Sequence, residues 1–321
     1  MDPGRDPTGM PGGWGRLPGR IPLISPGGCR MLFEGRRKRR RERRSALLPQ
    51  EGDWFRMPVR KARERIRTAR RIVVKVGTST LTYENGRMNL GSLERLCRVL
   101  ADQMNRGRQV VLVSSGAIGV GMGRLRMKEK PREMREKQAV AAVGQSELMN
   151  IYGRLMSEYG CLVGQVLLTR DDVEDEPTRT NVVNTLDTLL EKEVLPIVNE
   201  NDTVSTEEIY HNGTFGDNDT LSAIVARLVR ADVLVLLSDI DGLYDRDPRK
   251  DPDARLLPVV EAITPEIERA AGGAGTRRGT GGMRTKVEAA RIATGAGVDM
   301  VIASGRRSEE RRVGKECSLT C

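Results

Sequence analysis

The stretch Arg71-Ile72-Val73-Val74-Lys75-Val76-Gly77-Thr78-Ser79 decides the fold class of this chain. Its apolar run predicts a buried strand, which opens into a short turn that contains a glycine and two hydroxyl side chains. Backbone N–H groups in the turn can approach an anion closely because Gly77 lacks a Cβ, and Lys75 adds a positive charge. The stretch predicts either a phosphate-binding strand end of an α/β enzyme or an ordinary strand that ends in a solvated lysine.

Three further apolar runs, at residues 110–113, 195–198 and 233–237, end in polar clusters. The clusters are Ser114-Ser115-Gly116-Ala117, Asn199-Glu200-Asn201-Asp202 and Ser238-Asp239. Ligands of open parallel sheets bind beyond the carboxyl ends of the strands, where loops from different strands converge. The four strand ends therefore predict one shared site.

Helical patterns lie between the predicted strands. They cover residues 92–105, 135–159, 181–193 and 218–229. The alternation of strands and helices is typical of βαβ units, so it predicts the α/β class with a mainly parallel sheet.

Two more motifs place polar residues at the start of a predicted helix. Gly216-Asp217-Asn218-Asp219 carries two carboxylates and an amide, which can act as a helix cap and as a site at once. Thr280-Gly281-Gly282-Met283-Arg284-Thr285-Lys286 is a glycine-rich turn before a helix that continues to Thr294, and such an N-terminus favours phosphate. Its spacing is not that of a Walker A loop, and a flexible surface loop is the alternative interpretation.

Together these motifs resemble the amino acid kinase family. They occur in the order of the family between residues 70 and 305, and the chain adds Ala142-Val143-Gly144-Gln145 and Leu237-Ser238-Asp239-Ile240-Asp241-Gly242-Leu243-Tyr244. The resemblance implies a three-layer αβα sandwich with a mainly parallel central sheet. Within the family, the resemblance is to enzymes that use ATP to phosphorylate the side-chain carboxylate of L-glutamate. This reaction gives L-glutamyl 5-phosphate in the first step of proline biosynthesis.

This reaction suits the residue types of the chain. A glutamate side chain has an ordinary pKa of about 4.3, so it is already an ionised nucleophile near neutral pH and needs no general base. The chain has a single histidine, His211, and so offers few bases of that kind. The reaction does need relief of the repulsion between two anionic substrates, which lysines and Mg²⁺ supply.

The resemblance also implies roles for individual residues. The catalytic residues would be Lys75, Lys286, Asp217 and Asp219, the two aspartates orienting the lysines or touching Mg²⁺ through water. The substrate-binding residues would be Ser115, Asp202 and Asn218. The ATP-binding residues would be Lys75, Gly77, Ser238, Asp239, Thr280, Gly281, Gly282, Met283, Arg284, Thr285 and Lys286. No direct metal ligand is assigned, because ATP would carry most of the Mg²⁺ coordination.

Charge is distributed unevenly along the chain. Residues 1–70 carry 19 Lys and Arg against 7 Asp and Glu, whereas the rest carries 35 against 37. Residues 1–65 are rich in Gly, Pro and Arg and lack apolar periodicity, so they are predicted to be a disordered or non-native leader. A basic arm that contacts RNA, or a true start at Met57, are the alternatives for this leader.

The kinase domain is predicted at residues 66–306, and residues 307–321 are predicted to be an atypical tail. Family members continue after the position of Gly305 through a further segment and a closing strand. The resemblance thus implies that this segment is missing and that a sheet edge is left unpaired.

Cysteine usage and hydropathy bear on the compartment. The five cysteines are odd in number and form no Cys-x-x-Cys pair, which argues against a disulfide framework and for a reducing cytoplasm. No apolar run approaches the roughly 20 residues of a membrane span. We therefore expect no membrane partner, and no nucleic-acid partner for the folded domain because its net charge is slightly negative.

The resemblance implies further partners and leaves other functions open. It implies feedback inhibition by proline, to which the loop from Thr203 to Phe215 would contribute, a homo-oligomer, and glutamyl phosphate reductase as a pathway partner. Aspartate, carbamate and uridylate kinases share the broad fold, so these acceptors are alternatives. A truncated, inactive product with an RNA-contacting arm is the non-enzymatic alternative.

Overall fold

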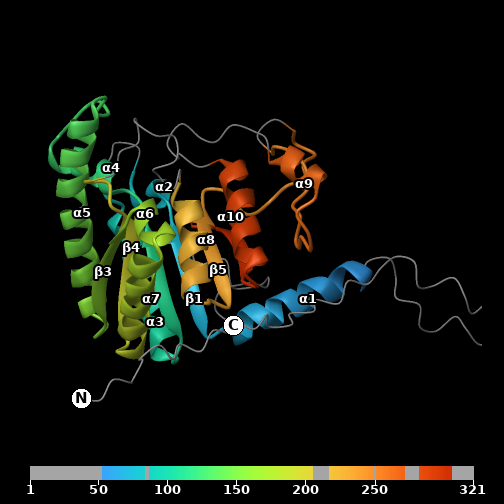
Figure 1. Cartoon of the computed structure of the whole chain (residues 1–321). Coiled ribbons are helices and arrows are strands. Elements are labelled where there is room, and N and C mark those ends of the chain that lie inside the picture. Colours follow the sequence, from blue (N-terminus) through green and yellow to red (C-terminus); the bar gives the residue numbers. More distant parts are fainter. Residues whose placement is uncertain (1–52, 84–86, 205–216, 249–250, 272–281, 306–321) are drawn as a thin grey trace, which may run out of the picture. The chain divides into compact units, whose positions relative to one another are not determined.

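A six-stranded parallel sheet lies at the centre of the part of the chain that the structure describes (Figure 1). This computed structural model describes residues 53–83, 87–204, 217–248, 251–271 and 282–305. Across the sheet the strands are β3 (Leu162–Leu168), β4 (Val194–Glu200), β2 (Gln109–Ser114), β1 (Arg71–Val76), β5 (Val233–Ser238) and β6 (Asp299–Ser304). All neighbouring pairs run parallel, so all carboxyl ends meet at one edge of the sheet.

Helices precede, connect and flank the strands. In chain order they are α1 (Asp53–Thr68), α2 (Thr78–Leu81), α3 (Leu90–Asn105), α4 (Ala117–Arg124), α5 (Met134–Ser157), α6 (Arg170–Glu174), α7 (Glu176–Glu191), α8 (Asn218–Leu228), α9 (Pro265–Ala270) and α10 (Met283–Gly295). Within the described residues, no helix has the length and apolar character needed to span a bilayer.

Alternation along β1 divides the core into two layers. Ile72, Val74 and Val76 belong to a buried cluster with side chains of α3 and α5. Val73, between them in sequence, belongs to a separate cluster with α7, α8 and α10. Successive side chains of a strand point to opposite faces, so the sheet is covered by helices on both sides. The predicted three-layer αβα sandwich is thus confirmed.

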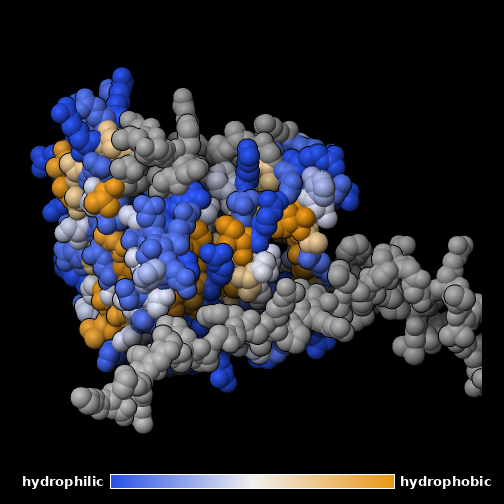
Figure 2. Space-filling model, in the orientation of Figure 1, coloured by the Kyte–Doolittle hydropathy of each residue, from blue (hydrophilic) through white to orange (hydrophobic). Residues whose placement is uncertain are grey.

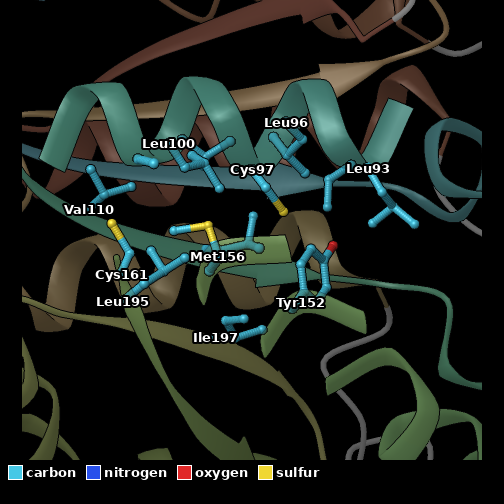
Figure 3. Packing of buried hydrophobic residues seen from close by; sticks show 14 of the residues in the cluster. Leu93, Leu96, Cys97, Leu100, Val110, Tyr152, Met156, Cys161, Leu195 and Ile197 are labelled. Carbon is cyan, nitrogen blue, oxygen red and sulfur yellow. The ribbon is translucent and has the colours of Figure 1, made fainter. Parts of the chain in front are cut away.

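The α3 and α5 layer is packed closely against the sheet. Leu93, Leu96 and Leu100 recur at helical spacing on α3 and face the strands, as Figure 3 shows. Burying each large apolar side chain of this kind contributes about 1.5–3 kcal/mol. From α5, the Tyr152 hydroxyl lies 2.9 Å from Ser114 Oγ at the end of β2. Burial raises the pKa of Tyr152 well above its ordinary value, so this hydroxyl stays neutral.

On the opposite face, α8 and α10 lie side by side (Figure 1). Ala223 and Ala226 of α8 and Ala289 and Ala293 of α10 are fully buried in this layer. Small side chains let two helices and the sheet approach closely. This packing places the first turns of α8 and α10 together, and both turns carry predicted site residues.

Two cysteines are described, and both are buried and free. Burial, helped by the Glu94 carboxylate, raises the pKa of the Cys97 thiol to about 12. Burial also raises the pKa of Cys161. Both thiols therefore stay protonated near neutral pH and behave as small core side chains.

Strands at residues 71–76, 110–113, 195–198 and 233–237 were predicted, and the structure places β1, β2, β4 and β5 there. Predicted helices correspond to α3, α5, α7, α8 and α10. Helix α7 begins at Glu176 instead of residue 181, because Asp175 accepts a hydrogen bond from Thr178 N at 3.0 Å and Pro177 occupies the first turn. Strands β3 and β6 were not predicted. Helix α1 begins within the predicted leader, so the boundary at residue 65 falls inside a helix.

Candidate active site

The carboxyl ends of the central strands bring the predicted site residues to one edge of the sheet. Lys75, the penultimate residue of β1, is aligned with Val113 of β2 and Leu236 of β5. By the alternation of β1, its side chain lies on the same face as Val73, which is the face covered by α8 and α10. The lysine therefore reaches the first turns of these two helices.

Asp219 joins the two predicted catalytic lysines. Its Oδ1 atom lies 2.6 Å from Lys75 Nζ, and its Oδ2 atom accepts a hydrogen bond from Lys286 Nζ at 2.9 Å. Asp219 is fully buried, and each lysine is only 6% exposed. Thr285 Oγ1 lies 3.0 Å from the same Oδ2 atom. One carboxylate thus holds two ammonium groups from β1 and α10 in fixed positions.

The electrostatics of this cluster follow from its burial. Burial alone would raise the pKa of Asp219, but the charges and hydrogen bonds of Lys75 and Lys286 outweigh it and hold the pKa below its ordinary value. The carboxylate therefore stays ionised. An ammonium group has three donors, so each lysine keeps donors for a bound anion after it contacts Asp219. The cluster is suited to binding the oxygens of a phosphoryl group.

Asp217 is the N-cap residue of α8 and lies beside this cluster. Its Oδ1 atom accepts the N–H of Asp219 at 3.4 Å and lies 4.0 Å from Lys75 Nζ. The predicted helix cap is therefore present. Its Oδ2 atom is buried, and no described residue donates a hydrogen bond to it. A buried carboxylate oxygen without a partner is costly, so this atom is suited to a cation or to water bound by a cation.

A second group of polar side chains is linked to Asn218 by hydrogen bonds. Asn218 Nδ2 donates to Ser115 Oγ at 2.8 Å and to Asn199 Oδ1 at 3.0 Å. Asn199 Nδ2 donates in turn to Gln145 Oε1 at 2.9 Å. These four side chains come from β4, α5, α8 and the turn after β2. The predicted residues Ser115 and Asn218 are thus in direct contact.

Two glycines fix the turn that carries Ser115. Gly116 has a φ of +105°, a conformation that other residues rarely adopt, and it begins α4. On α5, a Cβ at Gly144 would lie 1.7 Å from the carbonyl oxygen of Ala117. The backbones of α4 and α5 therefore touch at Gly144, and this contact holds the turn against the core.

The remaining predicted residues are distributed along the same edge. Gly77 precedes the first turn of α2, and Gly282, Met283 and Arg284 begin α10. Ser238 ends β5, and its hydroxyl lies 3.1 Å from Asp239 Oδ1. Asp202 lies in the turn after β4. Thr280 and Gly281 lie outside the described residues, as do His211 and most of the predicted proline-contacting loop.

Two buried polar residues of the site, Gln145 and Asn199, were given no role by the sequence analysis. Both lie in motifs that carried the family resemblance, Ala142-Val143-Gly144-Gln145 and Asn199-Glu200-Asn201-Asp202. A glutamine on an otherwise apolar helix face was the available signal. Gly144 was also given no role, because neither composition nor periodicity reveals its close contact with α4.

Metal binding by protein groups alone has little support in the described part of the chain. No group of three or more His, Cys, Asp or Glu side chains gathers there in a way that could hold a metal ion. Asp219 is already engaged by two lysines. Asp217 is therefore the carboxylate that fits a cation whose other ligands come from a substrate.

The chain resembles known proteins over most of this fold. Residues 70–304 match the sequence model of the amino acid kinase family. A glutamate 5-kinase of Clostridium perfringens (strain 13 / Type A) is 60% identical over 247 residues, which are 77% of this chain and 92% of that protein. A glutamate 5-kinase of Moorella thermoacetica is 59% identical over 249 residues, which are 78% of this chain and 65% of that longer protein.

A solved structure shares the fold. Carbamate kinase from Giardia lamblia bound to AMP-PNP superposes with a TM-score of 0.52 at 15% identity, covering 77% of this chain and 97% of that chain. At this identity the likeness concerns the arrangement of strands and helices alone.

Proposed function

The chain belongs to the amino acid kinase family, and from this premise we propose that it transfers the γ-phosphoryl group of ATP to the side-chain carboxylate of L-glutamate. The observation that carries the proposal is the first turn of α8. There Asp219 holds Lys75 and Lys286, while the adjacent Asn218 contacts Ser115. One turn thus joins a phosphoryl-binding cluster to a group of neutral hydrogen-bonding side chains.

The phosphoryl-transfer half acts through charge. Lys75 and Lys286 bind oxygens of the transferring group and neutralise the charge that develops on it. Asp219 fixes both ammonium groups before substrate binds, so little reorganisation is needed during the reaction. Backbone N–H groups at residues 77–79 add donors for the phosphate oxygens.

Magnesium fits this half through Asp217. When bound with ATP, Mg²⁺ neutralises phosphate charge and withdraws electron density from the transferring group. Mg²⁺ retains several waters, and Asp217 Oδ2, buried and without a donor among the described residues, would hold one of them. Asp219 acts on the lysines instead.

The acceptor half binds an amino acid. Ser115 donates to a carboxylate, and Asn218 together with Asp202 binds the ammonium group of L-glutamate. The side-chain carboxylate is ionised near neutral pH and attacks phosphorus directly, so no base is required. A carboxylate oxygen forms the new P–O bond as the bond from phosphorus to the ADP oxygen breaks, which gives L-glutamyl 5-phosphate and ADP.

The nucleotide is bound by the carboxyl end of β5 and the amino-terminal end of α10. Asp239 accepts from a ribose hydroxyl beside Ser238, and residues 280–286 bind the phosphates. Met283, Arg284 and Thr285 belong to the helical part of this stretch.

Further partners are part of the proposal. We propose feedback inhibition by proline at the acceptor half, coupling to a glutamyl phosphate reductase, and action in the cytoplasm. We also propose a homo-oligomer, for which edge strand β3 offers Leu162 with 69% exposure. Figure 2 shows hydrophobic areas among hydrophilic ones on one face of the molecule.

The alternative functions are less well supported. Relatives at 59–60% identity are named glutamate 5-kinase, which favours glutamate over aspartate, carbamate or UMP as acceptor. The ion pairs of Lys75 and Lys286 with Asp219 favour a working kinase over an inactive product with an RNA-contacting arm.

The proposal is tested by ADP release from the full chain with ATP and Mg²⁺ over a panel of acceptors. We expect release with L-glutamate and little with L-aspartate, carbamate or UMP. Equal turnover with aspartate, or turnover with UMP alone, would refute the assignment.

A further inference from the structure

A chain of three amides, two of them buried, links helix α5 to the acceptor half of the site. It begins at Gln145, which is 7% exposed, and passes through Asn199, which is 2% exposed, to Asn218. Gln145 Oε1 accepts from Asn199 Nδ2 at 2.9 Å, and Asn199 Oδ1 accepts from Asn218 Nδ2 at 3.0 Å. Each amide therefore orients the next one, and we call this chain the amide relay.

The relay determines which atoms the site offers to a ligand. Asn218 Nδ2 carries two hydrogens, and both are used, one on Asn199 Oδ1 and one on Ser115 Oγ at 2.8 Å. Asn218 Oδ1 has no donor among the described residues and is left as an acceptor. Ser115 Oγ already accepts from Asn218, so its own hydrogen is left for another acceptor.

This polarity matches an α-amino acid. An acceptor at Asn218 Oδ1 is the partner that an ammonium group requires, and a donor at Ser115 Oγ is the partner that a carboxylate requires. If every amide in the relay were reversed, Asn218 would present N–H groups and Ser115 would point its hydrogen inward. The reversed relay would repel the ammonium group.

We propose that Gln145 is a positioning residue that sets the direction of the amide relay and so determines recognition of the substrate's α-amino group. This inference rests on the proposed function. Gln145 keeps Oε1 on Asn199 although its Nε2 is buried without an acceptor among the described residues. Without that oxygen, the Asn199 amide loses the acceptor that fixes its orientation, and Asn218 loses its own in turn.

The test compares L-glutamate with glutarate, which has both carboxylates and lacks the amino group. Gln145→Met preserves the approximate size of the side chain and removes the acceptor. We expect the KM for L-glutamate to rise about tenfold and the preference for L-glutamate over glutarate in kcat/KM to fall about tenfold, with the KM for ATP unchanged.

Two further variants separate direction from packing. Tyr152→Phe removes a buried hydrogen bond from the same helix outside the relay, so it should lower the melting temperature and keep the preference. Asn199→Asp removes the hydrogen bond that residue 199 donates to Gln145. The new carboxylate can only accept from Asn218, so the direction of the amide relay is preserved. The preference for L-glutamate over glutarate should therefore be kept. This variant also keeps the inference testable if Gln145→Met does not fold.

The outcomes are distinct. A wild-type chain without glutamate-dependent ADP release would refute the proposed function itself. An active wild type with an unchanged preference in Gln145→Met, or a preference lost in Asn199→Asp, would overturn the relay.

Discussion

The cluster around Asp219 is held by charge, whereas the amide relay from Gln145 to Asn218 is held by neutral hydrogen bonds. In the first, a fully buried carboxylate contacts two lysines that are almost fully buried. In the second, three hydrogen bonds link three amides and the hydroxyl of Ser115. Both meet at the first turn of α8, so they are neighbours with different physical bases.

This difference separates two tasks of a kinase. Fixed charges stabilise a transferring phosphoryl group, whose negative charge is large and must be matched in the transition state. Neutral amides discriminate one acceptor from another, because a misplaced donor or acceptor leaves a buried polar group unpaired. We therefore expect variants in the Asp219 cluster to act on kcat and variants in the amide relay to act on KM.

The largest expected effect is that of Lys286→Ala. Removal of a preorganised charge should lower kcat about 10²–10³-fold, because its contact with the phosphoryl group is strongest in the transition state. The KM for L-glutamate should change little. Lys128→Ala, which removes an exposed lysine, is the matched control and should leave both constants unchanged. A Lys286→Ala enzyme with wild-type kcat would remove the lysine from the phosphoryl-transfer half.

Gly144→Ala should destabilise the acceptor half through packing. A Cβ 1.7 Å from the Ala117 carbonyl oxygen forces α4 and α5 apart, and overpacking of this kind costs about 1–3 kcal/mol or more. Urea unfolding monitored by circular dichroism measures the loss. Gly295→Ala is the control, because nothing lies within 4 Å of its Cβ position at the end of α10. Equal stability of the two variants would contradict the close contact.

Acid should weaken the Asp219 cluster before it affects the amides. The pKa of Asp219 is lowered in the folded chain, so its contribution to the free energy of unfolding is complete above the ordinary Asp pKa of about 3.9 and is lost as pH falls through the folded value. Wild type should therefore exceed Asp219→Asn in stability at pH 7, and the gap should shrink below about pH 4. Denaturant titrations at both pH values test this, and a gap that stays constant would argue against an ionised Asp219.

The smallest effect is expected outside both halves. We propose that residues 1–65 are a leader to the kinase domain, although helix α1 already begins at Asp53. Near the end of this helix, Arg65 Nη2 lies 2.7 Å from Asp299 Oδ1. Residues 1–50 lack the apolar periodicity of a core, so their deletion should leave kcat and the melting temperature nearly unchanged. Unfolding of the shortened chain would show that the boundary lies further toward the amino terminus.

The sequence predicts the central strands well because they are buried on both faces. Runs such as Val110-Val111-Leu112-Val113 are continuously apolar, which is typical of parallel strands under two helical layers. Strand β3 lies at an edge of the sheet and contains Gly164 and Gln165, so its pattern is weaker and it was missed.

The site was predictable in part for a related reason. Lys75, Asp219 and Lys286 stand at strand or helix ends within motifs, so their types and positions suggest a role. The Asp219 carboxylate contacts both lysines, which lie 144 and 67 residues away from it in the sequence. Periodicity cannot predict such tertiary contacts. Gln145 is similarly hidden, because an interior position on a helix gives no local sign of its distant partner.

The most direct measurement follows an oxygen atom. L-Glutamate labelled with ¹⁸O in its side-chain carboxylate is incubated with the chain, ATP and Mg²⁺, and hydroxylamine traps the acyl phosphate. Attack at the carbonyl carbon releases phosphate that retains the bridging oxygen. We expect glutamyl hydroxamate and inorganic phosphate in equal amounts, with one ¹⁸O atom in each phosphate. Phosphate without label, or ADP release without hydroxamate, would contradict attack by the glutamate carboxylate.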